Sequence, residues 1–265
     1  MQKESSVFRA CARLTVLMIH ILYALLLIVK YRAHHGREWF DTEPGKLIIR
    51  WWAQRACRIL AVRLHVKGAA SIVQDTLFVA NHISWLDIVA LSAVMNTKFI
   101  SKDSVRYWPI IGWLAIAIGT LFIHRGKSFA VNRMIEDVRL ELDNNHSILV
   151  FPEGTTTDGR QVARFHAGLF KSVSGTRHFV QAIALRYRRQ GGVDKFVPYI
   201  GNDNFAGHLF RMASLRETCL EVAFSQPFQT ANMSRYDIAM AAHDVIVDML
   251  RGHQDITPQR ERLVA

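Results

Sequence analysis

The sequence predicts an α/β domain with a mostly parallel sheet flanked by helices, preceded by an N-terminal membrane-anchoring helical segment. Short apolar runs of strand length alternate along the chain with longer segments of helical period. This alternation is typical of parallel sheets with helical crossovers. The start of the chain instead holds a long uncharged apolar run. A length of 265 residues suits one substantial domain with a small attachment.

The N-terminal apolar run, residues 14–29, reads LTVLMIHILYALLLIV and contains no charged residue. It is slightly shorter than the roughly 20 residues that cross a bilayer core. The flanking Arg13 and Lys30 can reach lipid headgroups, and Tyr31 and Trp39 can sit at the interface. No small-residue cleavage site follows, so a retained anchor is favoured over a cleaved signal peptide. A buried core helix is the remaining alternative.

The next segment predicts a linker followed by an amphipathic helix over Leu47–Leu64. The linker, RAHHGREWFDTEPGK, ends in a predicted Pro-Gly turn. The helix has a stripe of two arginines and a glutamine opposite an apolar side, so it can lie in a membrane interface or pack on its own domain. We therefore divide the chain into residues 1–64, a membrane anchor with an interfacial helix, and residues 65–265, the α/β domain.

From residue 76 onward the chain predicts strands and helices in alternation. The predicted strands are Thr76–Ala80, Phe99–Ser101, Ser147–Phe151, Phe179–Tyr187 and Leu220–Phe224. The predicted helices are Ser84–Met95, Ser128–Leu142 and Ser234–Arg251, the last starting with a Ser-x-x-Asp capping box. Sites in such sheets form beyond the carboxyl ends of strands, so functional residues are expected in the loops that follow them.

The formal net charge of +11 indicates an anionic partner: nucleic acid, an anionic membrane surface or an acidic substrate. No nucleic-acid-binding module is recognisable, and the apolar N-terminus favours a membrane. Cys11, Cys57 and Cys219 are few and widely spaced, so neither a disulfide framework nor a zinc site is predicted. A serine hydrolase is disfavoured because no Gly-x-Ser-x-Gly elbow occurs.

The stretch FVANHISWLDIVAL, residues 78–91, carries the candidate catalytic pair. His82 follows directly on a predicted strand, and Asp87 falls early in the next helix. A carboxylate there can accept the imidazole N–H and leave the other ring nitrogen free as a base. Ser84 and Asp87 also form a capping box, and a histidine beside a strand is often only a bonded polar residue. From spacing alone, the catalytic and the structural interpretation both stay open.

A second polar loop, FPEGTTTDGR, follows the strand predicted at Ser147–Phe151. Gly154 permits close backbone approach, and the hydroxyls and amides can bind an oxyanion or a polyol, although a simple turn is equally compatible. Between the two loops, Lys102 and Arg125 flank a long apolar stretch. This arrangement suits an amphiphile with an anionic head and an apolar tail, or a core segment with surface cations.

Together and in this order, these blocks resemble the glycerolipid acyltransferase family that includes 1-acyl-glycerol-3-phosphate acyltransferases. NHISWLD matches its Asn-His-x-x-x-x-Asp motif, and FPEGTTTDG matches its Phe-Pro-Glu-Gly-Thr block. SKDSVRYWPIIGWLAIAIGTLFIHR looks like the block between them, and FVQAIALRY is similar, more weakly, to the fourth block. The resemblance covers roughly residues 63–199.

The resemblance implies transfer of a fatty acyl group from acyl-CoA or acyl-ACP to the hydroxyl of a lysolipid, first of all 1-acyl-glycerol-3-phosphate to give phosphatidic acid. It makes His82 the general base and Asp87 the residue that orients it. It implies no cofactor and no metal, only the thioester as co-substrate. The implied partners are membrane lipid, the lysolipid and, as one option, acyl-carrier protein, with no nucleic acid. The residues implied in substrate binding are Asn81, Lys102, Arg125, Glu153, Gly154 and Thr155.

Two departures from the family pattern bear on the acceptor. Thr156 stands where phosphatidic-acid-forming members often carry arginine, and Ala182 replaces a proline of the fourth block. Another lysolipid, such as lyso-ornithine lipid or a lysophospholipid, is therefore an alternative acceptor. A non-catalytic basic membrane-binding protein is the alternative of another class. The expected location is the inner membrane with the catalytic domain on the cytoplasmic side, where activated thioesters are made.

Overall fold

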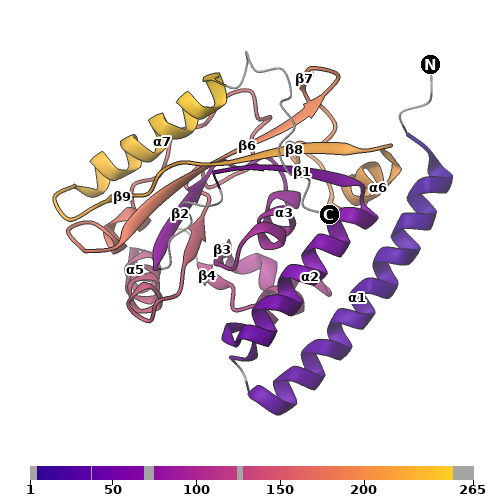
Figure 1. The fold of residues 1–265 in the computed structure, drawn as a ribbon, viewed down its shortest axis with the longest axis horizontal. Coiled ribbons are helices and arrows are strands. Elements are labelled where there is room, and N and C mark those ends of the chain that lie inside the picture. The colour runs from indigo at the N-terminus through magenta and orange to yellow at the C-terminus, as the bar shows by residue number, and fades with distance from the viewer. Residues whose placement is uncertain (1–4, 37, 69–74, 124–127, 253–265) are drawn as a thin grey trace.

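The structure, a computed structural model, describes residues 5–36, 38–68, 75–123 and 128–252. Its centre is one sheet (Figure 1). The strands are β1 (Val62–Lys67), β2 (Thr76–Ala80), β3 (Lys98–Lys102), β4 (Leu121–Ile123), β5 (Ile148–Val150), β6 (Phe179–Arg189), β7 (Gly192–Val193), β8 (Thr218–Phe224) and β9 (Phe228–Gln229). Their order is β1-β8-β6-β2-β5-β3-β4, and β7 and β9 pair with β6.

The sheet is mostly parallel, which confirms the predicted fold class. Strands β6, β2, β5, β3 and β4 run in one direction. Strand β8 is antiparallel to β6 and parallel to β1. The parallel strands end at a common edge, so the loops after β2, β3 and β5 meet there.

Helices cover both faces of this sheet. The α-helices are α1 (Val7–His35), α2 (Glu43–Ile59), α3 (Leu86–Val94), α4 (Ile111–Ala117), α5 (Ser128–Asp143), α6 (Phe205–Ser214) and α7 (Arg235–Gly252). Short 3₁₀ turns are η1 (Trp39–Asp41), η3 (Asp103–Tyr107) and η4 (Leu169–Ser172). One apolar core joins the sheet to α2, α3 and α6, and the other joins it to α5 and α7. Because side chains alternate along a strand, Leu185 and Tyr187 of β6 face the first core while Ala182 and Ala184 face the second.

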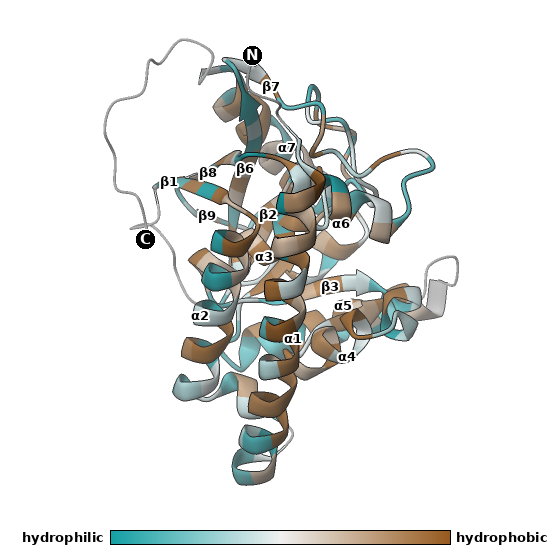
Figure 2. Ribbon diagram, turned by 90° about the vertical axis from the view of Figure 1, so that its right-hand side faces the viewer, coloured by the Kyte–Doolittle hydropathy of each residue, from teal (hydrophilic) through white to brown (hydrophobic). Residues whose placement is uncertain are grey.

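Helix α1 is long and apolar enough to cross a membrane, by length and composition, with a mean hydropathy of 2.2 in its most apolar window. Its first half is tied to the domain, because the Arg13 guanidinium donates to the carbonyl oxygens of Ala213 and Leu215 at 3.2 and 2.5 Å. Further along, His20 stacks on Trp52 of α2 with ring centroids 5.2 Å apart. Figure 2 shows α1 and α2 side by side, with apolar residues along α1. Large apolar side chains such as Leu26, 69% exposed, remain uncovered there.

The predicted Pro-Gly turn before α2 is wrong. Pro44 and Gly45 lie in the first turn of α2, and Thr42 caps that turn by accepting the Gly45 N–H at 3.2 Å. Proline suits this position because the first helical N–H groups have no partner within the helix.

The predicted end of this helix, at Leu64, is also wrong. Helix α2 stops at Ile59, Ala61 adopts a φ of 53°, and β1 begins at Val62. The boundary drawn between residues 64 and 65 therefore falls inside a strand. Helix α2 packs on α3, and the Gln54 side chain donates to the Ala93 carbonyl at 3.2 Å. These contacts favour packing on the domain over the purely interfacial interpretation of this helix.

Candidate active site

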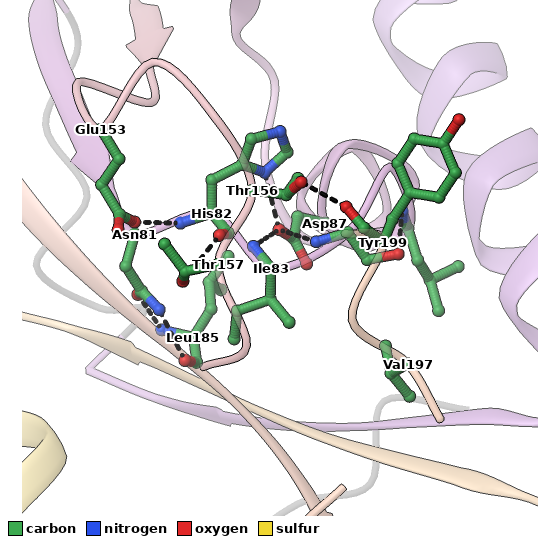
Figure 3. Close-up of polar contacts among 12 residues, drawn as sticks. Asn81, His82, Ile83, Asp87, Glu153, Thr156, Thr157, Leu185, Val197 and Tyr199 are labelled. Carbon is green, nitrogen blue, oxygen red and sulfur yellow. Dashed lines mark hydrogen bonds and ion pairs between the residues drawn. The ribbon is translucent and has the colours of Figure 1, made fainter. Parts of the chain in front are cut away.

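The candidate catalytic pair lies at the carboxyl edge of the sheet, where β2 ends and α3 begins. His82 Nδ1 lies 2.8 Å from Asp87 Oδ2, and Asp87 is completely buried whereas the His82 side chain is 17% exposed. Figure 3 shows one imidazole nitrogen directed at Asp87 and the other directed away from it. That second nitrogen, Nε2, makes no hydrogen bond to any residue that the structure describes. The pair therefore has the geometry of a histidine oriented by a carboxylate.

The Asp87 carboxylate is fixed by three further donors. The backbone N–H groups of Ile83 and Ser84 donate to Oδ2 at 2.7 and 2.9 Å. The Tyr187 hydroxyl donates to Oδ1 at 2.8 Å. The Ser84 contact is one half of the predicted capping box, so Asp87 both caps the start of α3 and faces His82. The structural interpretation and the catalytic interpretation of Asp87 are therefore compatible with each other.

Tyr187 is a functional residue that the sequence reasoning missed. It lies on β6, its side chain is 1% exposed, and its phenol reaches Asp87 from the strand next to β2. Burial and the neighbouring Asp87 charge raise the pKa of Tyr187 well above its ordinary value, so the hydroxyl remains a donor. The alternation of side chains along β6 could have indicated that Tyr187 points into the protein, because it places Tyr187 on the same face as Leu185.

The loop after β5 holds the backbone of His82. Glu153 Oε1 accepts the His82 N–H at 2.7 Å, and Oε2 accepts the Ala163 N–H at 2.7 Å. The Thr157 N–H donates to the His82 carbonyl oxygen at 2.8 Å. Burial raises the pKa of Glu153, and the two amide donors partly oppose that rise. Gly154 turns the chain with a φ of 71°, a conformation that favours glycine.

Asn81 and Phe151 complete the packing around His82. The Asn81 side chain exchanges hydrogen bonds with the Leu185 backbone at 3.0 and 2.8 Å, which extends the pairing of β2 with β6 by one step. The Phe151 ring, which the sequence reasoning also missed, stacks on the imidazole with centroids 4.0 Å apart. Asn81 and Glu153 therefore bond to the protein's own backbone and position His82. Contact of either side chain with substrate stays a prediction.

The other residues implied in substrate binding lie at or near the same edge. Leu77 of β2 and Lys98 of β3 both pair with Ile148 of β5, the strand between them. Four residues further along each strand, Lys102 is therefore level with Asn81, at a distance of two strand spacings or about 10 Å. Lys102 and Thr155 are exposed, and Gly154 is half-buried. Arg125 lies outside the described residues. Within the described ranges, no group of three or more His, Cys, Asp or Glu side chains is placed to hold a metal ion.

The Thr156 side chain is neutral and is already engaged. Its hydroxyl donates to the Tyr199 carbonyl oxygen, joining this loop to the segment before α6 (Figure 3). The position after the Phe-Pro-Glu-Gly-Thr block therefore presents no cation to the site.

Comparison with known proteins assigns the family. Residues 63–186 match the family model described as Acyltransferase. Over 201 residues the chain is 37% identical to the lyso-ornithine lipid O-acyltransferase of Pseudomonas aeruginosa, covering 75% of this chain and 76% of the relative. The chain belongs to the glycerolipid acyltransferase family. The matched range contains His82, Asp87 and Glu153, and it ends one residue before Tyr187.

A second relative and a solved structure are also similar to this acyltransferase. It is 33% identical to the 1-acyl-sn-glycerol-3-phosphate acyltransferase of Neisseria gonorrhoeae, over 56% of this chain and 58% of the relative. The crystal structure of the 1-acyl-sn-glycerophosphate acyltransferase from Thermotoga maritima superposes with a TM-score of 0.74, covering 95% of this chain and 97% of that chain at 17% identity. At that identity the likeness shows the fold. The predicted family and enzyme class are confirmed, and the chain is an acyltransferase of the lysolipid type.

Proposed function

We propose that His82 is the general base in the transfer of a fatty acyl group from a thioester to the hydroxyl of a lysolipid. The observation that carries the proposal is the 2.8 Å contact of His82 Nδ1 with the Asp87 carboxylate, with Nε2 left open at the carboxyl edge of the sheet. When the Nδ1–H is donated to Asp87, Nε2 carries the lone pair. General-base action of this kind contributes about 10²–10⁴-fold to a rate.

The proposed reaction forms no covalent enzyme intermediate. The acceptor's hydroxyl proton passes to Nε2 as its oxygen bonds to the thioester carbonyl carbon, and Asp87 stabilises the resulting imidazolium. The C–S bond then breaks, and the leaving thiolate takes the proton from the imidazolium. Acyl-CoA or acyl-ACP is the co-substrate, and no resident cofactor takes part. The remaining rate enhancement comes from orienting two amphiphiles against each other.

For the acceptor we favour lyso-ornithine lipid. The relative from Pseudomonas aeruginosa carries that activity in its name, and it is matched over 76% of its length. The neutral, engaged Thr156 hydroxyl also supports an acceptor without a phosphomonoester, because an ornithine head has an ammonium and a carboxylate instead. The second candidate is 1-acyl-glycerol-3-phosphate, which the Neisseria gonorrhoeae relative supports and for which Lys102 offers an exposed cation.

The apolar α1 and the membership in a lipid acyltransferase family support association with a membrane. We place the protein on the inner membrane with its catalytic domain on the cytoplasmic side. The thioester donors are made there, and the exposed apolar side chains of α1 can enter the lipid while the sheet stays in water.

Thiol release by the purified full-length protein tests the proposal. Palmitoyl-CoA and palmitoyl-ACP are each offered with lyso-ornithine lipid, 1-acyl-glycerol-3-phosphate or lysophosphatidylethanolamine, and His82→Ala serves as the control. We expect kcat/KM to be at least about tenfold higher with lyso-ornithine lipid, a difference of about 1.4 kcal/mol in transition-state binding. A higher value with 1-acyl-glycerol-3-phosphate supports the second candidate. Release that is equal in His82→Ala contradicts the mechanism for every acceptor.

A further inference from the structure

An arginine-lined pocket lies on the α7 side of the sheet, apart from His82. Its volume is about 540 Å³. It is bounded by the segment 159–162, the β6–β7 hairpin and the last turns of α7. Its cations are Arg160, Arg186, Arg188 and Arg251, joined by His243, and none of its described lining residues is Asp or Glu.

Within the part of the chain that the structure describes, the arginines of the pocket outnumber the carboxylates that contact them. Arg188 Nε lies 2.8 Å from Glu221 Oε1, and Arg160 Nε lies 3.6 Å from Asp158 Oδ2. The Arg186 side chain is half-buried, and its guanidinium forms no hydrogen bond or ion pair with any residue that the structure describes. Among the described residues, the four guanidinium groups of the pocket face the carboxylates of Glu221 and Asp158, and Asp244 contacts the lining His243 at 3.1 Å, so cations outnumber carboxylates there. Burial and the like charge of Arg188 lower the pKa of Arg186, and the nearby charge of Glu221 partly opposes them.

Such a pocket suits phosphate groups. The guanidinium fork donates two parallel hydrogen bonds to phosphate oxygens, and it is more weakly hydrated than an ammonium group. Several arginines around one open cavity favour a ligand that carries more than one phosphate or presents a phosphate to more than one arginine.

The pocket is close enough to His82 to serve the same reaction. The Thr157 N–H lies 2.8 Å from the His82 carbonyl oxygen, and Arg160 follows three residues later. Three extended residues span at most about 11 Å. The pantetheine arm between a thioester sulfur and its phosphate contains two amide units with flanking methylenes, so it is as long as four or five extended residues, about 15 Å.

The pocket also lies away from the second half of α1, whose apolar side chains are exposed. Figures 1 and 2 both place β7 at the end of the molecule opposite the turn between α1 and α2. A phosphate of the membrane itself would be expected beside the exposed apolar side chains in the second half of α1, such as Leu26 and Val29. The position of the arginines therefore favours a phosphate that arrives from water.

We propose that this pocket binds the phosphate that terminates the pantetheine arm of the acyl donor, together with the nucleotide phosphates when the donor is a coenzyme A thioester. The proposal rests on the proposed function, since it assigns the second substrate of the same reaction. It makes Arg186 and Arg251 donor-binding residues with no part in proton transfer.

Binding without chemistry tests the pocket directly. The full-length protein in detergent is titrated with free coenzyme A and with holo-acyl-carrier protein by calorimetry. Arg186→Gln and Arg251→Gln should each weaken binding of at least one of these ligands by about tenfold or more, the loss of one charge-assisted contact. Arg251 is exposed on α7, so its substitution leaves the folded core intact. Arg235→Gln is the matched control, about 24 Å away at the other end of the same helix.

Kinetics separate this inference from the proposed function. The two variants should raise the KM for the donor about tenfold while kcat and the KM for the acceptor stay within about twofold of wild type. The ligand that responds identifies the donor. If only the KM for the acceptor rises, or if neither ligand binds more weakly to the variants than to Arg235→Gln, the pocket is not the donor site. If the wild-type protein binds one of these ligands but transfers no acyl group, only the proposed function is contradicted.

Discussion

Two histidine–carboxylate contacts, His82–Asp87 and His178–Asp143, lie at opposite edges of the same sheet. His82 follows β2 and lies 2.8 Å from Asp87. His178 precedes β6, and its Nε2 lies 3.0 Å from Asp143 Oδ1 while its Nδ1 lies 4.0 Å from Asp75 Oδ2. Phe179, which follows His178, pairs with Thr76 at the start of β2.

The difference between the two pairs lies in what surrounds the imidazole. Both His178 nitrogens face carboxylates and its side chain is 2% exposed, so no nitrogen is open to a substrate. His82 uses one nitrogen for a fully buried carboxylate and keeps the other at a partly exposed edge. A histidine–carboxylate contact is therefore not by itself a catalytic site. The free ring nitrogen, and its position at the end of a strand, distinguish the candidate base His82 from the structural histidine His178.

The largest expected effect is on turnover when His82 is replaced. His82→Gln should lower kcat by about 10²–10⁴-fold, because it removes the only group placed to take the acceptor's proton among the residues described around this edge. The melting temperature should stay close to wild type, because the imidazole is partly exposed and the backbone contacts of residue 82 are kept. Thiol release and a thermal melt measure the two quantities. A variant that unfolds at the assay temperature is replaced by His82→Ala.

Asp87→Asn should produce the next largest effect, a fall in kcat of about 10²–10³-fold. An amide can still accept the backbone N–H groups of Ile83 and Ser84, but it cannot stabilise an imidazolium by charge. The fold should survive for the same reason. A kcat within threefold of wild type, at an unchanged melting temperature, contradicts the role of the carboxylate.

Tyr187→Phe should lower kcat about tenfold and also destabilise the fold. It removes a buried hydrogen bond to a charged group, worth about 1.5–3 kcal/mol. Tyr236→Phe, on the exposed side of α7, is the control and should change neither quantity. Loss of stability without loss of turnover in Tyr187→Phe would show that the phenol only packs.

The Tyr187 phenol also predicts a pH dependence of stability. Its pKa is raised in the folded state, so its contribution is fully present below the unfolded pKa of about 10 and is lost as pH rises toward the folded pKa. Wild type should therefore lose free energy of unfolding more steeply above about pH 10 than Tyr187→Phe does. Parallel curves from urea melts at pH 8 to 11 contradict this assignment.

The smallest effect on activity is expected for the second pair. His178→Asn should leave kcat within about twofold of wild type and lower the free energy of unfolding by about 1–2 kcal/mol, since it breaks one hydrogen bond to a half-exposed carboxylate. The same thiol-release assay and urea melts suffice. If His178→Asn abolishes turnover in a folded protein, position in the sheet does not distinguish the two histidines.

The strands around the site were predictable because their patterns are local. Thr76–Ala80 is a fully buried apolar run, and it forms β2 with the predicted bounds. The capping box at Ser234 is present, with the Asp237 carboxylate accepting the Ser234 N–H at 3.2 Å. The end of α2 was not predictable in this way. Residues 60–64 continue the apolar period of the helix. Residues 62–64 instead form a strand because β1 pairs with β8, which lies more than 150 residues later in the chain.

Within the site, the sequence located the pair but not its supports. His82 and Asp87 are close in the chain, so a strand–helix junction suffices to bring them together. Tyr187 lies 100 residues beyond Asp87, and its contact depends on β6 lying beside β2. Glu153 was predicted to bind substrate, which stays a prediction, and no sequence pattern indicated that its carboxylate accepts the backbone N–H groups of His82 and Ala163. Such contacts depend on the strand order, which no local pattern specifies.

The claim on which the rest depends is that Asp87 acts through His82. The most direct test is a double-mutant cycle on kcat, measured by thiol release from wild type, His82→Gln, Asp87→Asn and the double variant. Residues that act as one unit are strongly non-additive, so the double variant should be no more than about threefold slower than His82→Gln alone. If the two losses multiply instead, the two side chains act separately and the account of this site is contradicted.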